Sequence, residues 1–310
     1  MKGTVLRSTG SQYIVLLKDK TILTCRIKGR FRLEGSKSTN PIAVGDLVET
    51  EAEDSGNNGV ITELLPRKNY IIRRSANLSK QTHVIAANLD HAYIVVTLAM
   101  PRTSLGFVDR LLATAEAYSI PASIIFNKTD IYAEEGLNEL AQLSRIYESA
   151  GYSCHRVSAK NGEGIGSLNK LMKGKVNLIT GHSGVGKSTL INALIPGLEL
   201  PTGELSEAHE KGMHHTTFAE MHRLPESGFL IDTPGLKEFG IINVAKEELS
   251  HFFPDIFRIA KDCRFSSCLH MSEPGCAVTA AVETNQLAVS RYNSYYGIVS
   301  GTELNKEFDD

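Results

Sequence analysis

Long apolar runs are missing from the sequence. Val84–Met100 comes nearest, but Asn88, Asp90 and His91 interrupt it, and no run approaches the ~18 residues that a membrane-spanning helix needs. The first residues, Met1–Thr4, also lack the apolar core of a signal peptide. These absences argue against a membrane partner and predict a cytoplasmic location.

Cysteine is scarce, with five in 310 residues. Cys25 and Cys154 stand alone and the other three cluster, which does not suggest a disulfide framework. The cluster with its neighbouring histidine consists of Cys263, Cys268, His270 and Cys276. Three thiolates and one imidazole fill all four positions of a tetrahedral Zn²⁺ site and leave none open for water. We therefore predict one structural Zn²⁺ that stabilises this segment, with unligated thiols as the alternative.

Charge is unevenly distributed behind a net charge of −2. Residues 1–75 hold 13 Lys/Arg and 8 Asp/Glu, a net charge of +5, whereas the remainder holds 20 and 27, a net charge of −7. A basic first segment suggests a polyanionic partner, and a merely solvated basic surface is the alternative. Within it, Arg26, Lys28, Arg30 and Arg32 alternate, so an extended chain would place them on one face as a stripe that follows phosphates.

Residues 1–70 have the pattern of a small β-barrel. The chain is long enough for two or three domains, and its first part consists of short β-rich runs separated by turn signals. The runs are Thr4–Arg7, Tyr13–Leu17, Ile22–Ile27, Leu47–Ala52 and Val60–Leu65. We predict an OB-fold, with an SH3-like barrel as the alternative.

Residues 71–240 alternate strands with helices. The expected strands are Ala92–Leu98, Ala122–Phe126, Ser153–Val157 and Val176–Thr180, and the expected helices are Phe107–Tyr118 and Leu137–Ser149. This alternation indicates an α/β domain with a parallel sheet and helices on both faces. Residues 241–310 differ, because the cysteine cluster leads into a polar helical stretch, Ala277–Tyr296, and an acidic tail. We predict a C-terminal domain that binds zinc and is helical.

A phosphate-binding loop lies between the strand Val176–Thr180 and the helical pattern Ser188–Leu194. Its residues match the P-loop pattern in full: Gly181, His182, Ser183, Gly184, Val185, Gly186, Lys187 and Ser188. The glycines let backbone N–H groups converge on phosphate oxygens, and the helix start adds a favourable dipole. We expect Lys187 to reach the β- and γ-phosphates as a catalytic residue, Ser188 to ligate Mg²⁺, and Thr189 to complete the binding loop.

A second Mg²⁺ anchor is predicted at Asp232–Gly235, which follows the apolar strand Phe229–Ile231. In P-loop proteins the Asp at this position holds Mg²⁺ through water, and the Gly N–H senses the γ-phosphate. We therefore assign Asp232 to Mg²⁺ and Gly235 to the nucleotide.

Guanine recognition is predicted at Asn127–Asp130, after another apolar strand. Asp130 can accept hydrogen bonds from the N1–H and the exocyclic amine of guanine, whereas adenine offers neither donor and would leave the carboxylate unpaired. Lys128 can cover the ring, and Asn127 can tie neighbouring loops. About 30 residues later, Ser158, Ala159 and Lys160 end the next strand, and their backbone N–H groups can face the guanine O6.

The order of these motifs is rotated, because the base loops precede the phosphate loop. A sheet accepts such a permutation when the old termini are joined and a new break opens elsewhere. The residue after the Asp232–Gly235 motif is Leu236, where many GTPases place a water-orienting Gln. The long segment Leu198–Thr217 offers His215 to orient water and Thr217 to complete the Mg²⁺ shell, with His182 as a weaker candidate.

Together these residues resemble the ribosome small subunit-dependent GTPase A family, RsgA, which is a family of circularly permuted GTPases. The resemblance covers nearly the whole chain, from the barrel through the rotated motifs to the cysteine cluster. It implies an α/β P-loop GTPase domain with an N-terminal OB-fold and a C-terminal zinc-binding domain. It also implies that GTP hydrolysis is stimulated by the small ribosomal subunit during late maturation, and that the OB-fold and zinc domain bind rRNA. The His215–Thr217 segment matches the family's His-Thr-Thr, with the His as a catalytic candidate. We expect GTP/GDP, Mg²⁺ and one Zn²⁺ as cofactors and a monomeric chain; an RNA-binding switch that does not act on the ribosome is the alternative.

Overall fold

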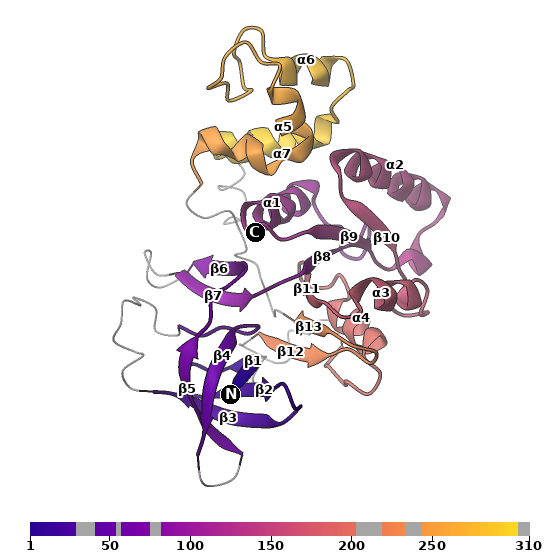
Figure 1. Cartoon of the computed structure of the whole chain (residues 1–310). Coiled ribbons are helices and arrows are strands. Elements are labelled where there is room, and N and C mark those ends of the chain that lie inside the picture. The colour runs from indigo at the N-terminus through magenta and orange to yellow at the C-terminus, as the bar shows by residue number, and fades with distance from the viewer. Residues whose placement is uncertain (29–40, 54–56, 75–81, 203–218, 233–243, 303–310) are drawn as a thin grey trace, which may run out of the picture.

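The protein has three parts, which follow one another along the chain (Figure 1). A computed structural model describes all residues except 29–40, 54–56, 75–81, 203–218, 233–243 and 303–310. A β-barrel comes first, then a sheet flanked by helices, then a small helical part. Among the described residues, no helix combines the length and the apolar character that crossing a membrane requires.

The barrel is built from five short strands. They are β1 (Lys2–Ser8), β2 (Tyr13–Leu17), β3 (Ile22–Ile27), β4 (Leu47–Ala52) and β5 (Asn58–Leu64). Side chains alternate between the interior and the surface, and Val5, Val15 and Val48 are buried at the centre. The strands pair in the order β1-β2-β3-β5-β4, and β4 returns to β1 to close the barrel. Within it β3 runs parallel to β5. This closed arrangement confirms the predicted OB-like barrel.

The central sheet is mostly parallel. Its strands are β8 (His91–Val96), β9 (Ala122–Phe126), β10 (Ser153–Arg156), β11 (Val176–Thr180), β12 (Glu220–Arg223) and β13 (Phe229–Asp232). They pair in the order β10-β9-β8-β11-β13-β12, and β12 is antiparallel to β13. Strands β8, β9, β11 and β13 are mostly apolar because both faces of the sheet are covered, whereas β10 and β12 are polar. On one face lie α1 (Leu105–Ala117) and α2 (Glu134–Ala150), and on the other α3 (Ile165–Met172) and α4 (Lys187–Leu194).

The barrel and the central sheet are joined by backbone pairing. Arg7 of β1 lies opposite Glu220 of β12, so both parts belong to one extended sheet. A hairpin of β6 (Tyr70–Arg74) and β7 (Thr82–Ala87) lies beside this junction (Figure 1). This hairpin was not predicted from the sequence.

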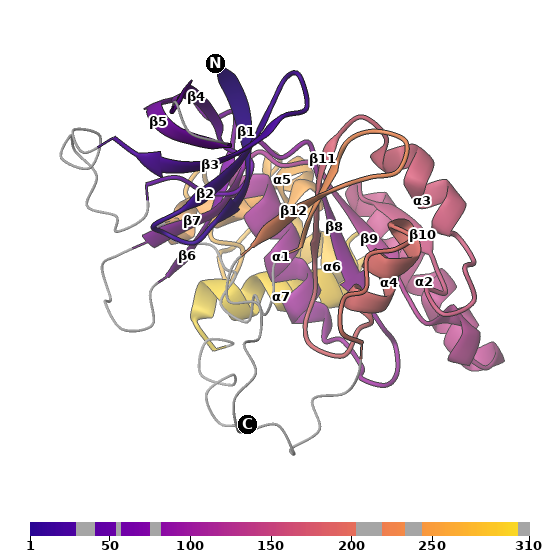
Figure 2. The same ribbon diagram turned by 90° about the horizontal axis from the view of Figure 1, so that it is seen from below.

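The C-terminal part is helical. It contains the 3₁₀-helix η4 (Lys246–Phe252), α5 (Pro254–Ala260), α6 (Ala277–Glu283) and α7 (Val289–Ser300). The predicted continuous stretch Ala277–Tyr296 is in fact two helices. Asn285 adopts a left-handed backbone with φ 58°, and the N–H groups of Gln286 and Leu287 donate to the carbonyl of Ala281, which ends α6. The second helix, α7, packs beside α1 (Figure 2).

The predicted basic stripe is partly offset by acidic side chains. Arg26 Nη2 lies 2.5 Å from Glu53 Oε1, and Lys28 Nζ lies 3.8 Å from Glu51 Oε2. These pairs are exposed and therefore weak, but they place carboxylates among the cations. Arg30 and Arg32 lie outside the described residues.

Candidate functional site

The predicted nucleotide motifs meet at one edge of the central sheet. Asn127 follows β9, Ser158 lies just beyond β10, Gly181 follows β11, and Asp232 is the last residue of β13. Because these strands are parallel, their carboxyl ends share an edge, which is where open parallel sheets bind ligands.

The phosphate loop, Gly181–Ser188, requires glycine for steric reasons. Gly186 has φ +89°, and a Cβ there would lie 2.6 Å from Asn127 Nδ2. Gly181 has φ +153°, and its Cβ would lie 2.5 Å from the carbonyl oxygen of Val95. Side chains at either position would displace the neighbouring loop or strand, so the glycines keep the backbone close to the base loop and to β8.

Lys187 points its ammonium group into the concave side of the phosphate loop. Its Nζ donates to the carbonyl oxygens of Gly181 and His182, both at 2.7 Å. Burial lowers the pKa of Lys187, and the negative charge of Asp232 opposes that shift. The cation therefore lies among the carbonyls that surround the expected phosphate position, with the first turn of α4 carrying Ser188 and Thr189 beside it.

Asn127 connects three loops. Its side chain is buried; Nδ2 donates to the carbonyl of Val185 at 2.8 Å, and Oδ1 accepts from the N–H of Ala159 at 3.1 Å. Its backbone carbonyl accepts a hydrogen bond of 2.7 Å from the hydroxyl of Tyr132. The phosphate loop is thus fixed to both base loops through one amide, and Tyr132 is a contributor that the sequence reading missed.

The second base loop orients Asp130. Ser158 Oγ donates to Asp130 Oδ1 at 2.6 Å, and Ser158 is buried while Asp130 is exposed. Asp130 lies in the 3₁₀ turn η2 (Thr129–Ile131), preceded by Lys128 with φ 61°. Lys128 Nζ donates to the carbonyl of Met100. Lys160, next to the buried Ala159, is exposed at the same edge.

His182 is held by a loop that the sequence reading did not assign to the site. Its Nε2 lies 2.7 Å from Thr103 Oγ1, its Nδ1 lies 2.8 Å from the carbonyl oxygen of Ser183, and Phe107 packs edge-on against the ring. Burial, followed by the charges of Lys187 and Lys128, lowers the pKa of His182. Both ring nitrogens are engaged in these contacts, so in this geometry the histidine supports the loop. No local sequence signal marks a contact between residues so far apart in the chain.

Three predicted residues lie outside the described part of the chain: Gly235, His215 and Thr217. They remain predictions.

The predicted zinc ligands, Cys263, Cys268, His270 and Cys276, converge, with ligand atoms all within 4.8 Å of one another. Cys263 Sγ and Cys276 Sγ each lie 3.5 Å from His270 Nδ1, and 3.9 Å separates the two sulfurs. A tetrahedral Zn²⁺ with Zn–S of about 2.3 Å and Zn–N of about 2.05 Å requires S···N of about 3.6 Å and S···S of about 3.8 Å. The donor set and its spacing fit one structural Zn²⁺.

Hydrogen bonds from α7 and from Glu273 fix the loop that carries these ligands. Tyr292 and Tyr295 of α7 donate to the carbonyls of His270 and Leu269 at 2.8 and 3.0 Å. Glu273 accepts from three backbone N–H groups of the loop. Burial opposes its ionisation, but the backbone hydrogen bonds prevail and lower the pKa of Glu273 to about 2. The ligands were predicted from the sequence, but these supporting hydrogen bonds were not.

Family models match two adjoining segments, the RsgA N-terminal domain over residues 2–61 and the RsgA GTPase over residues 64–242. The chain belongs to the RsgA GTPase family. Curated relatives named "Small ribosomal subunit biogenesis GTPase RsgA" match over their full length. One from Bacteroides fragilis (strain ATCC 25285) is 51% identical over 306 residues, which cover 99% of this chain and 98% of the relative. One from Christiangramia forsetii is 49% identical over 311 residues, covering 100% and 99%.

Solved structures agree with the RsgA assignment. YjeQ from Thermotoga maritima has a TM-score of 0.80 at 34% identity, covering 97% of both chains. YloQ, described as a circularly permuted GTPase, has a TM-score of 0.75 at 26% identity, covering 98% of this chain and 95% of its own. As an RsgA GTPase, this chain is a GTP hydrolase that uses GTP/GDP and Mg²⁺, and its base loops precede its phosphate loop.

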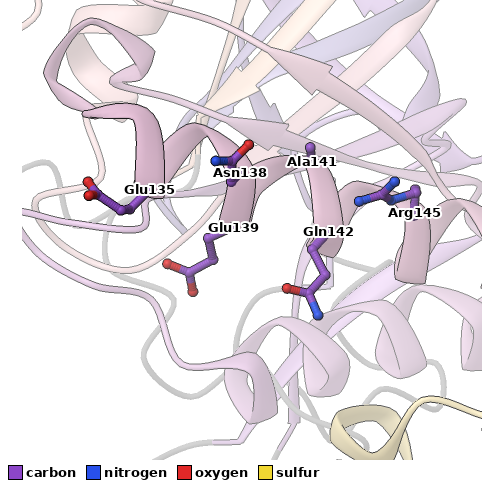
Figure 3. A pocket seen from close by; sticks show the side chains of 6 residues that line it. All are labelled: Glu135, Asn138, Glu139, Ala141, Gln142 and Arg145. Atoms are coloured by element: carbon purple, nitrogen blue, oxygen red, sulfur yellow. The ribbon is translucent and has the colours of Figure 1, made fainter.

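A hollow lies on the exposed face of α2. It is lined by Glu135, Asn138, Glu139, Ala141, Gln142 and Arg145 (Figure 3). All six residues come from one helix and project from its surface, and Glu139 forms an ion pair with Arg102. Since the lining residues come from a single helix, we base the RsgA nucleotide site on the loop geometry and not on this hollow.

Proposed function

We propose that this GTPase binds the small ribosomal subunit through rRNA and acts in late maturation of that subunit, which in turn stimulates hydrolysis of GTP to GDP and phosphate. The main support is the full-length similarity, at about half identity, to proteins named small ribosomal subunit biogenesis GTPases. The OB-like barrel and the basic excess of residues 1–75 add chemistry suited to a polyanion.

For the chemical step, we propose that Lys187 neutralises charge developing on the β- and γ-phosphates. Ser188, Asp232 and Thr217 would hold Mg²⁺, and the N–H of Gly235 would sense the γ-phosphate. His215 would orient the attacking water, because Leu236 cannot. The position of the Lys187 ammonium group inside the phosphate loop supports its part of the proposal.

For the base, we propose that Asp130 accepts from guanine N1–H and the exocyclic amine. The Ser158 hydroxyl would keep one carboxylate oxygen oriented, and the backbone of Ala159 and Lys160 would face O6. Lys128 would cover one side of the ring. An adenine in this position would leave the carboxylate without donors, which gives the guanine preference.

We further propose that residues 1–70 and 241–310 provide the RNA contacts while residues 71–240 hydrolyse GTP, and that the chain works as a monomer in the cytoplasm. The basic charge is concentrated in the first of these segments.

The proposal is tested by GTP turnover with and without purified mature small subunits, at two salt concentrations. We expect the subunits to raise kcat, and we expect the stimulation to weaken at higher salt because phosphate contacts release counterions. Large subunits at equal concentration are the control. Turnover that small subunits leave unchanged would contradict the ribosomal role and favour an RNA-binding switch with another partner.

A further inference from the structure

Helix α1 makes contact with the phosphate loop at its amino end. Thr103, just before the N-cap Ser104, accepts from the N–H of Thr97 at 3.0 Å and meets His182 Nε2 at 2.7 Å. His182 Nδ1 faces the carbonyl oxygen of Ser183, so the proton belongs on Nδ1, and Nε2 accepts from the Thr103 hydroxyl. Together with Phe107 against the ring, these contacts fix one side of the phosphate loop to the start of α1.

The same helix is fixed to the C-terminal domain one turn further on. Asp109 of α1 is buried and pairs with Arg291 Nη1 of α7 at 2.6 Å. The other edge of the Arg291 guanidinium binds Asp255 of α5 in a bidentate manner, at 2.9 and 2.8 Å. Aromatic rings surround the guanidinium: Phe253, Tyr147 and Tyr152, at 4.9, 5.7 and 5.8 Å from its carbon to the ring centroids.

Helix α1 is therefore packed on both sides. Val108, Leu111 and Leu112 belong to the core between α1 and the central sheet, whereas Ala113 belongs to the core of the C-terminal domain. Breaking a buried ion pair leaves an uncompensated charge in the interior and strongly destabilises the fold, so α1 and α7 are constrained to move together. Movement of α1 relative to the sheet would in turn displace Thr103 from His182.

We propose that α1 couples the C-terminal domain to the phosphate loop, through Asp109–Arg291 at one end and Thr103–His182 at the other. Arg291 and His182 are then positioning residues for nucleotide binding. Occupation of the phosphate loop stabilises the docked C-terminal domain, and a docked C-terminal domain strengthens nucleotide binding by the same factor, because such coupling is reciprocal. The inference depends on the GTPase activity of the family and not on the ribosomal role.

The test uses the full-length, zinc-loaded chain without ribosomal subunits. Amide hydrogen exchange in α7 is measured with and without saturating GDP, and GDP affinity is measured with a fluorescent analogue. We expect GDP to slow exchange in α7 of the wild type. Thr103→Val, which removes the hydroxyl, should lose that response and weaken GDP binding about 2- to 30-fold, the range for residues in a coupling network. Thr103→Ser, which keeps the hydroxyl, should behave as the wild type.

A second variant removes the contact between α1 and the C-terminal domain. Arg291→Gln should weaken GDP binding in the same range, and combining it with Thr103→Val should weaken binding by less than the product of the two single effects. The matched control is Arg258→Ala, since Arg258 donates to the Ser149 carbonyl at the end of α2 and so contacts the central domain without α1. It should leave GDP affinity unchanged.

Zinc content and the thermal midpoint are measured for every variant, to separate loss of coupling from loss of folding. If Arg291→Gln loses zinc, the Thr103 pair decides the outcome alone. Equal exchange in wild-type α7 with and without GDP would overturn the proposal. A GDP-induced slowing that persists fully in Thr103→Val would also overturn it.

Discussion

Replacement of Asn127 by alanine gives a sharp test of how the nucleotide site is held together. The change removes two side-chain hydrogen bonds, one to the Val185 carbonyl and one from the Ala159 N–H. It leaves both backbone groups without their partner in a buried position. The phosphate loop and the second base loop then lose their shared link.

The expected magnitude follows from those two groups. A hydrogen bond contributes about 1 kcal/mol net, and a buried group left unpaired costs about 1–3 kcal/mol. Water that enters the space left by the amide would restore part of this, so we expect a loss of about 2–3 kcal/mol. If this loss destabilises the nucleotide-bound protein relative to the free protein, GDP binds about 30- to 150-fold more weakly, since 1.4 kcal/mol is a factor of ten.

The assay is GDP affinity, measured by titration with a fluorescent analogue beside urea unfolding of the free protein. Asn177→Ala is the matched control, because Asn177 is also buried but uses its amide on the carbonyls of Met172, Lys175 and Phe229. It should lower the free energy of unfolding and leave GDP affinity alone. An Asn127→Ala variant that binds GDP within about threefold of the wild type would refute the reasoning, as would an equal loss in Asn177→Ala.

Three further predictions follow from single groups. Asp130→Asn should shift nucleotide preference from GTP to xanthosine triphosphate, because the amide can donate to the xanthine oxygen; competition binding measures this, and retained GTP preference would contradict it. Cys276→Ser should reduce zinc below about one ion per chain by metal analysis and lower the thermal midpoint, since a structural Zn²⁺ supplies folding energy; full zinc content in the variant would speak against the four-ligand site. Burial, with the charges of Lys175 and His155, lowers the pKa of His91 from 6.5 to about 4. The unfolded chain therefore binds the proton more readily than the folded chain does. As a result, the free energy of unfolding is at its full value above pH 6.5 and decreases as pH falls to about 4, by about 1–2 kcal/mol after allowance for partial exposure. In His91→Gln, the free energy of unfolding from urea titrations should change less between pH 7 and pH 5 than in the wild type. An equal change in the variant and the wild type would refute this prediction.

Regular apolar patterns could be predicted from the sequence, whereas a short strand of mixed composition and a helix end without glycine could not. The strands Tyr13–Leu17 and Val176–Thr180 were predicted with the bounds that the structure has, because alternation and continuous apolar runs report burial directly. The β6–β7 hairpin was missed, since its first strand, Tyr70–Arg74, is short and mixes aliphatic and basic residues. The break between α6 and α7 was missed because the residue with the left-handed backbone is Asn285 and not a glycine, which is the usual sequence signal for a helix end.

The candidate site shows the same division. Motif residues such as Asn127 and Asp130 stand out in the sequence because the chemistry of guanine and phosphate demands those residue types at fixed local spacing, and their nucleotide contacts stay predictions. The residues that hold them and the phosphate loop in place could not be predicted. Tyr132, Thr103 and Phe107 belong to no motif, and they matter because the fold brings them into contact with Asn127 or His182. Composition and periodicity carry no information on such pairs.

The rotated motif order has a structural consequence that concerns α1. Because the base-binding half of the sheet comes first in the chain, α1 precedes β13. The chain leaves β13 at Asp232 and continues to the C-terminal domain. That domain then packs back on α1 through Asp109 and Arg291. The C-terminal domain is thus attached at two points, by the chain that continues from Asp232 and by α1, whose amino end contacts His182. Two attachments restrict the domain more than one would, and on our proposal its position therefore depends on how the phosphate site is occupied.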